Sequence, residues 1–128
     1  MRERLEDAVD AVSLDVMVQR RSARGLPPPV ADSASDRQEF TEEARAFLER
    51  LSADLLREAT ADLRRKASET AARAAGNELM RLLTAQVILA RALPDYWQRF
   101  ETIRHAYTAE RVGSGGDRRG LVSRLFRR

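Results

Sequence analysis

Residues 77–93 read NELMRLLTAQVILARAL, and this stretch decides the fold. Its leucine, methionine, valine, isoleucine and alanine side chains cover most of the circumference of a helix. A helix that is apolar nearly all round is buried by neighbouring helices or by lipid. Arg81 and Arg91 bracket a run that is much shorter than the roughly 20 apolar residues of a membrane span. The stretch therefore predicts a core helix that needs partners on several sides, from the rest of the chain and from other copies of it.

The composition predicts a single all-α domain. The chain has 128 residues, of which 43% are hydrophobic, 34% are charged and only 5% are aromatic. This size and balance fit one folded domain, and the frequent alanines favour helices. We expect a helical hairpin or bundle of three to four helices, at about residues 2–24, 36–75, 77–93 and 95–111. A flexible linker at 112–120 and a short amphipathic helix at 121–128 are expected to follow.

The chain has no cysteine, which excludes a disulfide framework and thiolate metal sites. Its first residues, MRERLED, are charged and lack the apolar core of a signal peptide. The basic residues are arginines except for Lys66, as is typical of a GC-rich genome. We expect a bacterial cytoplasmic protein that can attach peripherally to the inner membrane.

Residues 2–24 have the spacing of an amphipathic helix, and Gly25 is a plausible stop. We favour a helix packed on the core of its own chain, with a detachable helix that binds a partner as the alternative. Residues 25–35 contain three consecutive prolines, which indicate a stiff spacer rather than a ligand for an SH3-like domain. The apolar face of this first helix consists of Leu5, Val9, Val12 and Val16.

The second helix is expected to begin near Asp36, because Ser35 and Gln38 match a capping box. A strict heptad fails farther along at Glu58 and Asp62, which favours bundle packing over a long zipper. At Gly76-Asn77 two readings stay open. We prefer a tight hairpin, in which glycine ends one helix and asparagine caps the next. One continuous helix through the glycine is the alternative.

Leu93-Pro94 marks another helix boundary. Most of the aromatic residues follow it at helical spacing, which indicates a core or a subunit interface. An aromatic ligand pocket or a base-stacking platform is the alternative. The residues assigned to the core and the oligomer interface are Leu79, Leu82, Leu83, Val87, Ile88, Leu89, Leu93, Tyr96, Trp97, Phe100, Ile103 and Tyr107.

Catalytic patterns are weak. The only histidine, His105, has Glu101 four residues before it, and two ligands on one helix are too few for a metal site. We interpret this pair as a surface contact. The glycines fit no phosphate-binding loop, and no zinc pattern occurs. The sequence therefore predicts a protein that is not an enzyme and has no cofactor and no metal.

The strongest functional pattern lies in the last eleven residues, which carry five arginines and no acid. Of the 23 basic residues 18 remain elsewhere, against 20 acidic ones, so the rest of the chain is slightly acidic. If the tail is helical, its apolar side chains share one face with arginines around it, as in a helix that lies in a membrane interface. The predicted docking residues are Arg118, Arg119, Leu121, Val122, Arg124, Leu125, Phe126, Arg127 and Arg128.

The end of the chain, GLVSRLFRR, resembles the C-terminal membrane-targeting helices of bacterial Min-system ATPases and actin-like division proteins. Those helices are also short, basic and faced with leucine and phenylalanine. The resemblance is confined to residues 118–128 and implies reversible attachment to anionic lipid. It implies nothing about the rest of the chain, where no ATPase motif is present.

These patterns predict a non-enzymatic, oligomeric helical scaffold or adaptor that docks on an anionic membrane through its tail. The first alternative is an accessory, cargo or coat protein whose tail binds a protein shell or another protein partner, similar to the phasins of storage granules. Nucleic-acid binding by the arginines is the third reading, disfavoured because the rest of the chain is acidic.

Overall fold

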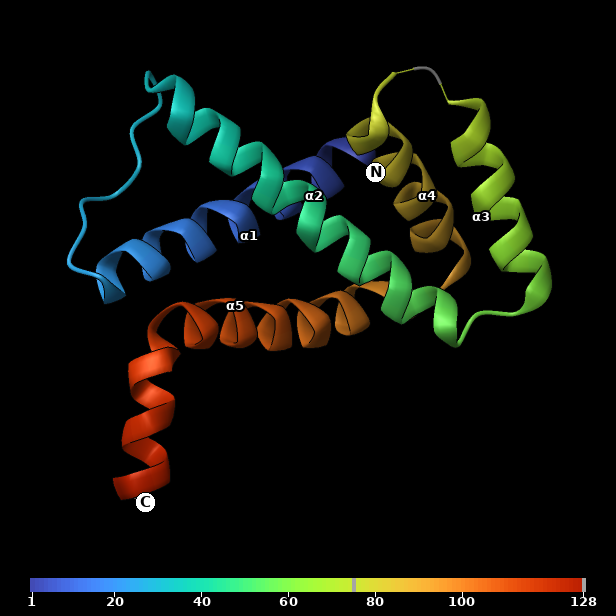
Figure 1. Cartoon of the computed structure of the whole chain (residues 1–128). Helices are drawn as coiled ribbons and strands as arrows, with labels where there is room; N and C mark the ends of the chain where they lie inside the picture. Colours follow the sequence, from blue (N-terminus) through green and yellow to red (C-terminus); the bar gives the residue numbers. More distant parts are fainter. Residues whose placement is uncertain (75, 128) are drawn as a thin grey trace.

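The computed structural model describes residues 1–74 and 76–127, with side chains up to Gly113. Its five helices are α1 (Arg2–Ala23), α2 (Ala34–Arg57), α3 (Ala61–Arg73), α4 (Glu78–Ala92) and α5 (Tyr96–Arg127), and the described residues include no strand. Helices α1, α2, α4 and α5 surround one core, and α3 packs on the outer side of α4 (Figure 1). The predicted all-α class is confirmed.

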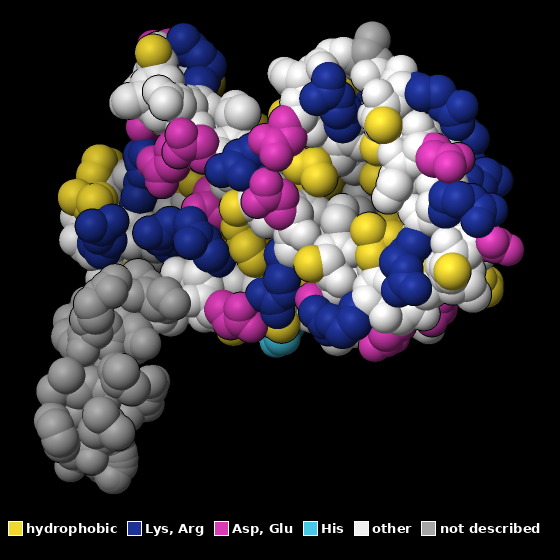
Figure 2. Space-filling view, turned by 45° about the vertical axis from the view of Figure 1, so that its right-hand side comes forward, with side chains coloured by type: hydrophobic (Ala, Val, Ile, Leu, Met, Phe, Trp, Pro, Cys, Tyr) yellow, Lys and Arg dark blue, Asp and Glu magenta, His cyan; other side chains and the backbone are white. Residues whose placement is uncertain are grey.

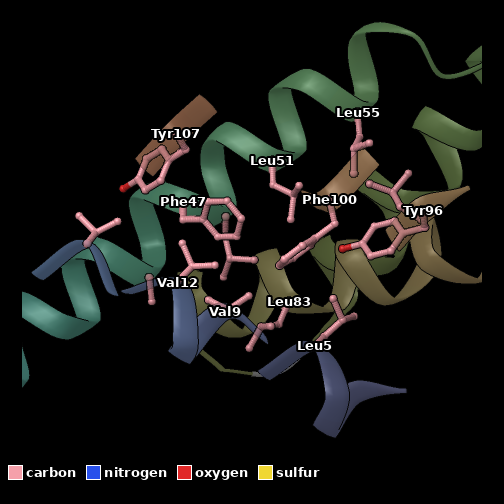
Figure 3. Packing of buried hydrophobic residues seen from close by; sticks show 14 residues of the cluster. Leu5, Val9, Val12, Phe47, Leu51, Leu55, Leu83, Tyr96, Phe100 and Tyr107 are labelled. Carbon is pink, nitrogen blue, oxygen red and sulfur yellow. The ribbon is translucent and has the colours of Figure 1, made fainter. Parts of the chain in front are cut away.

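Apolar side chains from four helices meet in the core (Figure 3). The predicted face of α1 is buried along its whole length, so this helix is part of the core. Phe47 of α2 lies against two aromatic rings of α5, with ring centroids 5.4 Å from Phe100 and 5.2 Å from Tyr107. The buried cluster comprises Leu5, Val9, Val12, Val16, Ala44, Phe47, Leu48, Leu51, Leu55, Leu83, Leu89, Tyr96, Phe100 and Tyr107.

The helices that cover the apolar surface of α4 all belong to the same chain. It contacts α1, α2, α3 and α5, and its large apolar side chains are all buried or half-buried. Its buried Gln86 donates a hydrogen bond to Ser52 Oγ over 2.8 Å and accepts one from the Tyr96 hydroxyl over 2.8 Å. The apolar perimeter of α4 therefore gives no reason to expect a second copy at this place.

One helix boundary was missed and one N-cap was misplaced. The stretch 36–75, which was expected to be one helix, is divided between α2 and α3. Thr60 begins the second of these helices as its N-cap, and its side chain accepts a hydrogen bond from Leu63 N. Helix α2 begins two residues earlier than expected, because its N-cap is Ser33, which accepts from Asp36 N. The helix count is therefore five rather than three to four.

Helices α3 and α4 are separate, as the preferred hairpin requires, but glycine does not end α3 as predicted, since that helix ends at Arg73 with Ala74 as its C-cap. Gly76 has a φ of +114°, and Asn77 caps α4 by accepting a hydrogen bond from Met80 N over 3.0 Å. At the other expected stop, Gly25 has a φ of +72°, and the amides of Gly25 and Leu26 donate to carbonyls in the last turn of α1. This is the hydrogen-bond pattern of a Schellman cap.

Gly76→Ala is expected to lower the free energy of unfolding by about 1–2 kcal/mol. An L residue rarely adopts this φ, and the new Cβ would lie 3.1 Å from Met80 Cβ. Gly113→Ala is the matched control, because Gly113 is helical and a Cβ there meets nothing within 4 Å. The control should be neutral or stabilise by about 0.5–1 kcal/mol. Urea unfolding measures both, and equal effects at the two positions would contradict the prediction.

Candidate functional site

The nine predicted docking residues, 118–128 without Gly120 and Ser123, lie outside the described side chains. Helix α5 is assigned through to Arg127, across the segment expected to be a linker. The linker at 112–120 and the amphipathic character of 121–128 therefore stay predictions. The nearest described side chains are those of α5 up to Gly113, and they determine where the C-terminal segment leaves the body of the protein.

A buried carboxylate fixes this part of α5. Glu43 of α2 is only 3% exposed. Its carboxylate accepts a hydrogen bond of 2.7 Å from the Tyr107 hydroxyl and further bonds from the Arg111 guanidinium, at 3.3 Å from Nε and also from Nη2. Arg20 of α1 donates to the same carboxylate over 3.1 Å. Three helices thus meet at one ionised group, which we call the Glu43 cluster (Arg20, Glu43, Tyr107 and Arg111).

The electrostatics keep the Glu43 cluster charged. Burial by itself raises the pKa of Glu43, but the hydrogen bonds from Arg111 and Tyr107 and the charges of Arg111 and Arg20 outweigh it, so the pKa lies below its ordinary value. Burial and the hydrogen bond to Glu43 raise the pKa of Tyr107, so the phenol keeps its proton and remains a donor. One donor is unsatisfied, since Arg20 Nε is buried without a hydrogen-bond partner.

Further ion pairs join α2 to α5 along its length. Arg50 donates to both carboxylate oxygens of Glu110, over 2.7 and 3.2 Å, and Arg99 donates to Glu58 over 3.1 Å. Together with the Glu43 cluster, these contacts hold the described part of α5 on the body.

The aromatic and apolar residues predicted for the core or an oligomer interface lie in or against the core of the single chain. Leu83, Leu89, Tyr96, Phe100 and Tyr107 are buried. Burial leaves these three aromatic rings unavailable for stacking on a base or a ligand. Six further predicted residues are partly buried and pack against the apolar core: Leu79, Leu82, Val87, Leu93, Trp97 and Ile103. Ile88 is half-buried.

The expected contact between Glu101 and His105 is absent. Glu101 accepts instead from Arg104 over 2.9 Å, because an arginine three residues away on the same helix reaches the carboxylate. His105 is exposed. Among the described residues no group of three or more potential metal ligands comes together, and no helix there is long and apolar enough to cross a membrane.

The Glu43 cluster was missed by reasoning from sequence. Tyr107 and Arg111 lie 64 and 68 residues away from Glu43 along the chain, so no local pattern joins them. The available signal was the position of Glu43 itself, one residue before Ala44 and four before Phe47 on the apolar face of α2. A carboxylate at such a place needs buried partners.

Basic and acidic side chains are interspersed on the face of the described residues drawn in Figure 2. Twelve ion pairs are present among the described residues. The face that is drawn therefore offers no broad basic surface to a polyanion.

Comparisons with known proteins found no counterpart for this chain: no family model, curated protein or solved structure matches it.

Proposed function

We propose that this chain is a non-enzymatic, oligomeric helical adaptor that docks on an anionic membrane surface through residues 118–128. The observation that carries the proposal is the anchoring of α5 by the Glu43 cluster up to Arg111, with six residues between that point and a segment that is basic and has apolar residues at helical spacing. The anchored part of α5 is covalently continuous with the tail through residues 112–117. A docked tail would therefore hold the whole molecule at the membrane surface.

The charge distribution supports the same proposal. The five arginines of the tail have no acid among them, whereas many arginines of the body are neutralised in ion pairs. Each arginine near an anionic surface contributes about 1 kcal/mol. Each buried CH₂ of the apolar side chains adds roughly 0.8 kcal/mol, and ordering of the peptide offsets part of this.

One tail should therefore bind weakly and in a salt-dependent manner. Two or more tails on one assembly bind more strongly, because the second contact forms at a high effective concentration. Oligomerisation is thus the part of the proposal that allows tails of low individual affinity to hold the protein at the membrane.

Deletion of residues 118–128 is expected to abolish co-sedimentation with vesicles that contain anionic lipid and to leave the helical circular dichroism signal per residue nearly unchanged. The double variant Leu125→Gln and Phe126→Gln should weaken binding strongly, because it removes the apolar contacts and keeps every arginine. Ser123→Ala is the matched control and should bind like the wild type. Retained binding by the deletion variant, or equal binding to zwitterionic vesicles, would refute the membrane part of the proposal.

A further inference from the structure

A hollow with a mainly apolar lining lies beneath the connector between α1 and α2. The connector bridges the open end between these two helices (Figure 1), and the hollow has a volume of about 510 Å³. Sites for small molecules usually have volumes of about 300–1,000 Å³, so the hollow is large enough for one such ligand. The lining residues are Leu14, Met17, Pro29, Val30, Ala31, Asp36, Arg37 and Phe40.

Part of the apolar lining is open to solvent. Leu14 of α1 and Val30 of the connector both line the hollow and are 49% and 54% exposed. Met17 is buried and Phe40 is half-buried in the same lining. An apolar occupant would remove the exposed side chains from water, which favours binding in proportion to the apolar area that it covers.

Polar contacts fix the wall that the connector provides. Val30 N donates to Asp36 Oδ2 over 2.9 Å, and Arg37 Nη1 donates to the Ala31 carbonyl over 2.9 Å. Arg21 of α1 donates to Asp36 Oδ1 over 2.7 Å, which ties α1 to the start of α2 beside the hollow. The hollow therefore belongs to the folded body, and a ligand would not have to order the connector.

The lining contains two charged side chains, and only one of them is neutralised. Arg21 donates to both carboxylate oxygens of Asp36. Arg37 is exposed and pairs with no carboxylate in the described part of the chain. Its Nη1 is bonded to the Ala31 carbonyl, which leaves the donors on Nε and Nη2 for a ligand. Asp32 of the connector is exposed but does not line the hollow. The uncompensated charge of the lining is therefore positive.

We propose that this hollow binds a fatty acid, a single apolar chain with an anionic head group. The chain would cover the apolar lining, and the carboxylate would accept hydrogen bonds from the exposed Arg37 guanidinium. A cationic head group would be repelled by that arginine. The volume is that of a site for one small molecule, which favours a free single-chain acid over a membrane phospholipid with two chains. The proposal concerns the body of the protein and does not depend on the tail.

Isothermal titration calorimetry of the full-length chain with decanoate, below the concentration at which decanoate forms micelles, tests the proposal. We expect saturable binding. Leu14→Gln and Val30→Gln should each lower the association constant about five- to tenfold, because each replaces an apolar contact with a polar side chain. Val18→Gln is the matched control, because Val18 is an apolar residue of α1 that is 38% exposed and does not line the hollow. Circular dichroism checks that all variants are folded.

A change of head group tests the role of Arg37. Decanol has the same chain without the charge and should bind about fivefold more weakly than decanoate. Arg37→Gln should remove this difference by weakening the binding of decanoate alone, and Arg37→Lys should retain most of it. Arg24→Gln is the matched control and should bind both ligands like the wild type. Arg24 is also exposed, and it does not line this hollow.

Three calorimetric results would overturn the proposal: no saturable binding of decanoate, equal effects of Val30→Gln and Val18→Gln, or a head-group preference that survives Arg37→Gln. Two further measurements identify other occupants. Loss of co-sedimentation with anionic vesicles in Leu14→Gln and Val30→Gln would make a membrane lipid the occupant. Association of copies that the same two variants weaken, measured by sedimentation equilibrium without decanoate, would assign the hollow to a second copy. Either result would overturn the proposal as well.

This proposal and the proposed function fail separately. A chain that binds decanoate at the hollow but does not sediment with anionic vesicles would refute only the proposed function. A chain that sediments with vesicles through its tail but binds no decanoate would refute only the fatty-acid site.

Discussion

Glu43→Gln is expected to lower the free energy of unfolding by about 3 kcal/mol at neutral pH. The substitution removes the charge that three helices share and leaves the guanidinium groups of Arg20 and Arg111 without their carboxylate. The value lies at the lower end for a buried ion pair, because the two arginine side chains are 26% and 39% exposed and can turn toward water.

Urea unfolding measures this effect, and Glu42→Gln provides the control. Glu42 is the exposed neighbour of Glu43, so the same chemical change there should alter the free energy of unfolding by less than about 0.5 kcal/mol. Hydrogen exchange should also become faster around Tyr107 and Arg111 in Glu43→Gln. Similar stabilities of the two variants would show that the Glu43 cluster does not stabilise α5.

The effect of Glu43→Gln should shrink in acid. The folded-state pKa of Glu43 is lowered, so its ionisation stabilises the fold fully above the glutamate pKa of the unfolded chain, about 4.3. That contribution is lost as the pH falls through the lower pKa of the folded state. Urea unfolding of wild type and variant at neutral and at acidic pH should show the difference closing, and a difference that is independent of pH would contradict this assignment.

Phe47→Ala is expected to cost about 3–5 kcal/mol, the largest effect of any single substitution considered. The ring is completely buried, and it makes an edge-to-face contact with Phe100 at an interplanar angle of 82° as well as a tilted contact with Tyr107. Truncation would leave a cavity where α2 meets α5, because the surrounding helices are held in place by their other contacts.

Phe40→Ala is the matched control for Phe47→Ala. Phe40 lies on the same helix but is only half-buried, in the lining of a hollow that also includes Leu14 and Met17. Its truncation therefore removes less contact and should lower the free energy of unfolding by about 1 kcal/mol. Urea unfolding with an unchanged denaturant slope would assign the difference to stability. Equal costs at the two positions would mean that Phe47 is not a central core residue.

Helix positions could be predicted wherever a residue pattern is local. The spacing of Leu5, Val9, Val12 and Val16 predicted both α1 and its buried face. Asn77 was correctly predicted as the cap of α4, whereas the end of α3 lies at Arg73, before the glycine that was expected to stop it. The division between α2 and α3 was missed because residues 58–60 contain neither glycine nor proline. Its only signals were the cap at Thr60 and the failure of the heptad.

Contacts between distant parts of the chain could not be predicted. Ser52, Gln86 and Tyr96 are joined by two hydrogen bonds, and Gln86 and Tyr96 are buried, although each residue looks unremarkable in its own helix. Leu14, Met17 and Val18 are further apolar residues of α1, and of these three only Met17 is buried. Which side of a broad apolar face is covered depends on the crossing of the helices, and local spacing does not specify it.

The only tryptophan gives the protein a built-in optical probe. Trp97, at the start of α5, lies beneath the guanidinium of Arg4 in α1, 4.0 Å from ring centre to cation. A cation over an indole changes the electrostatic field that the excited ring experiences. Intrinsic fluorescence therefore reports whether α1 is packed against α5. Departure of that helix to another molecule, the alternative left open by the sequence, would shift the emission without any added label.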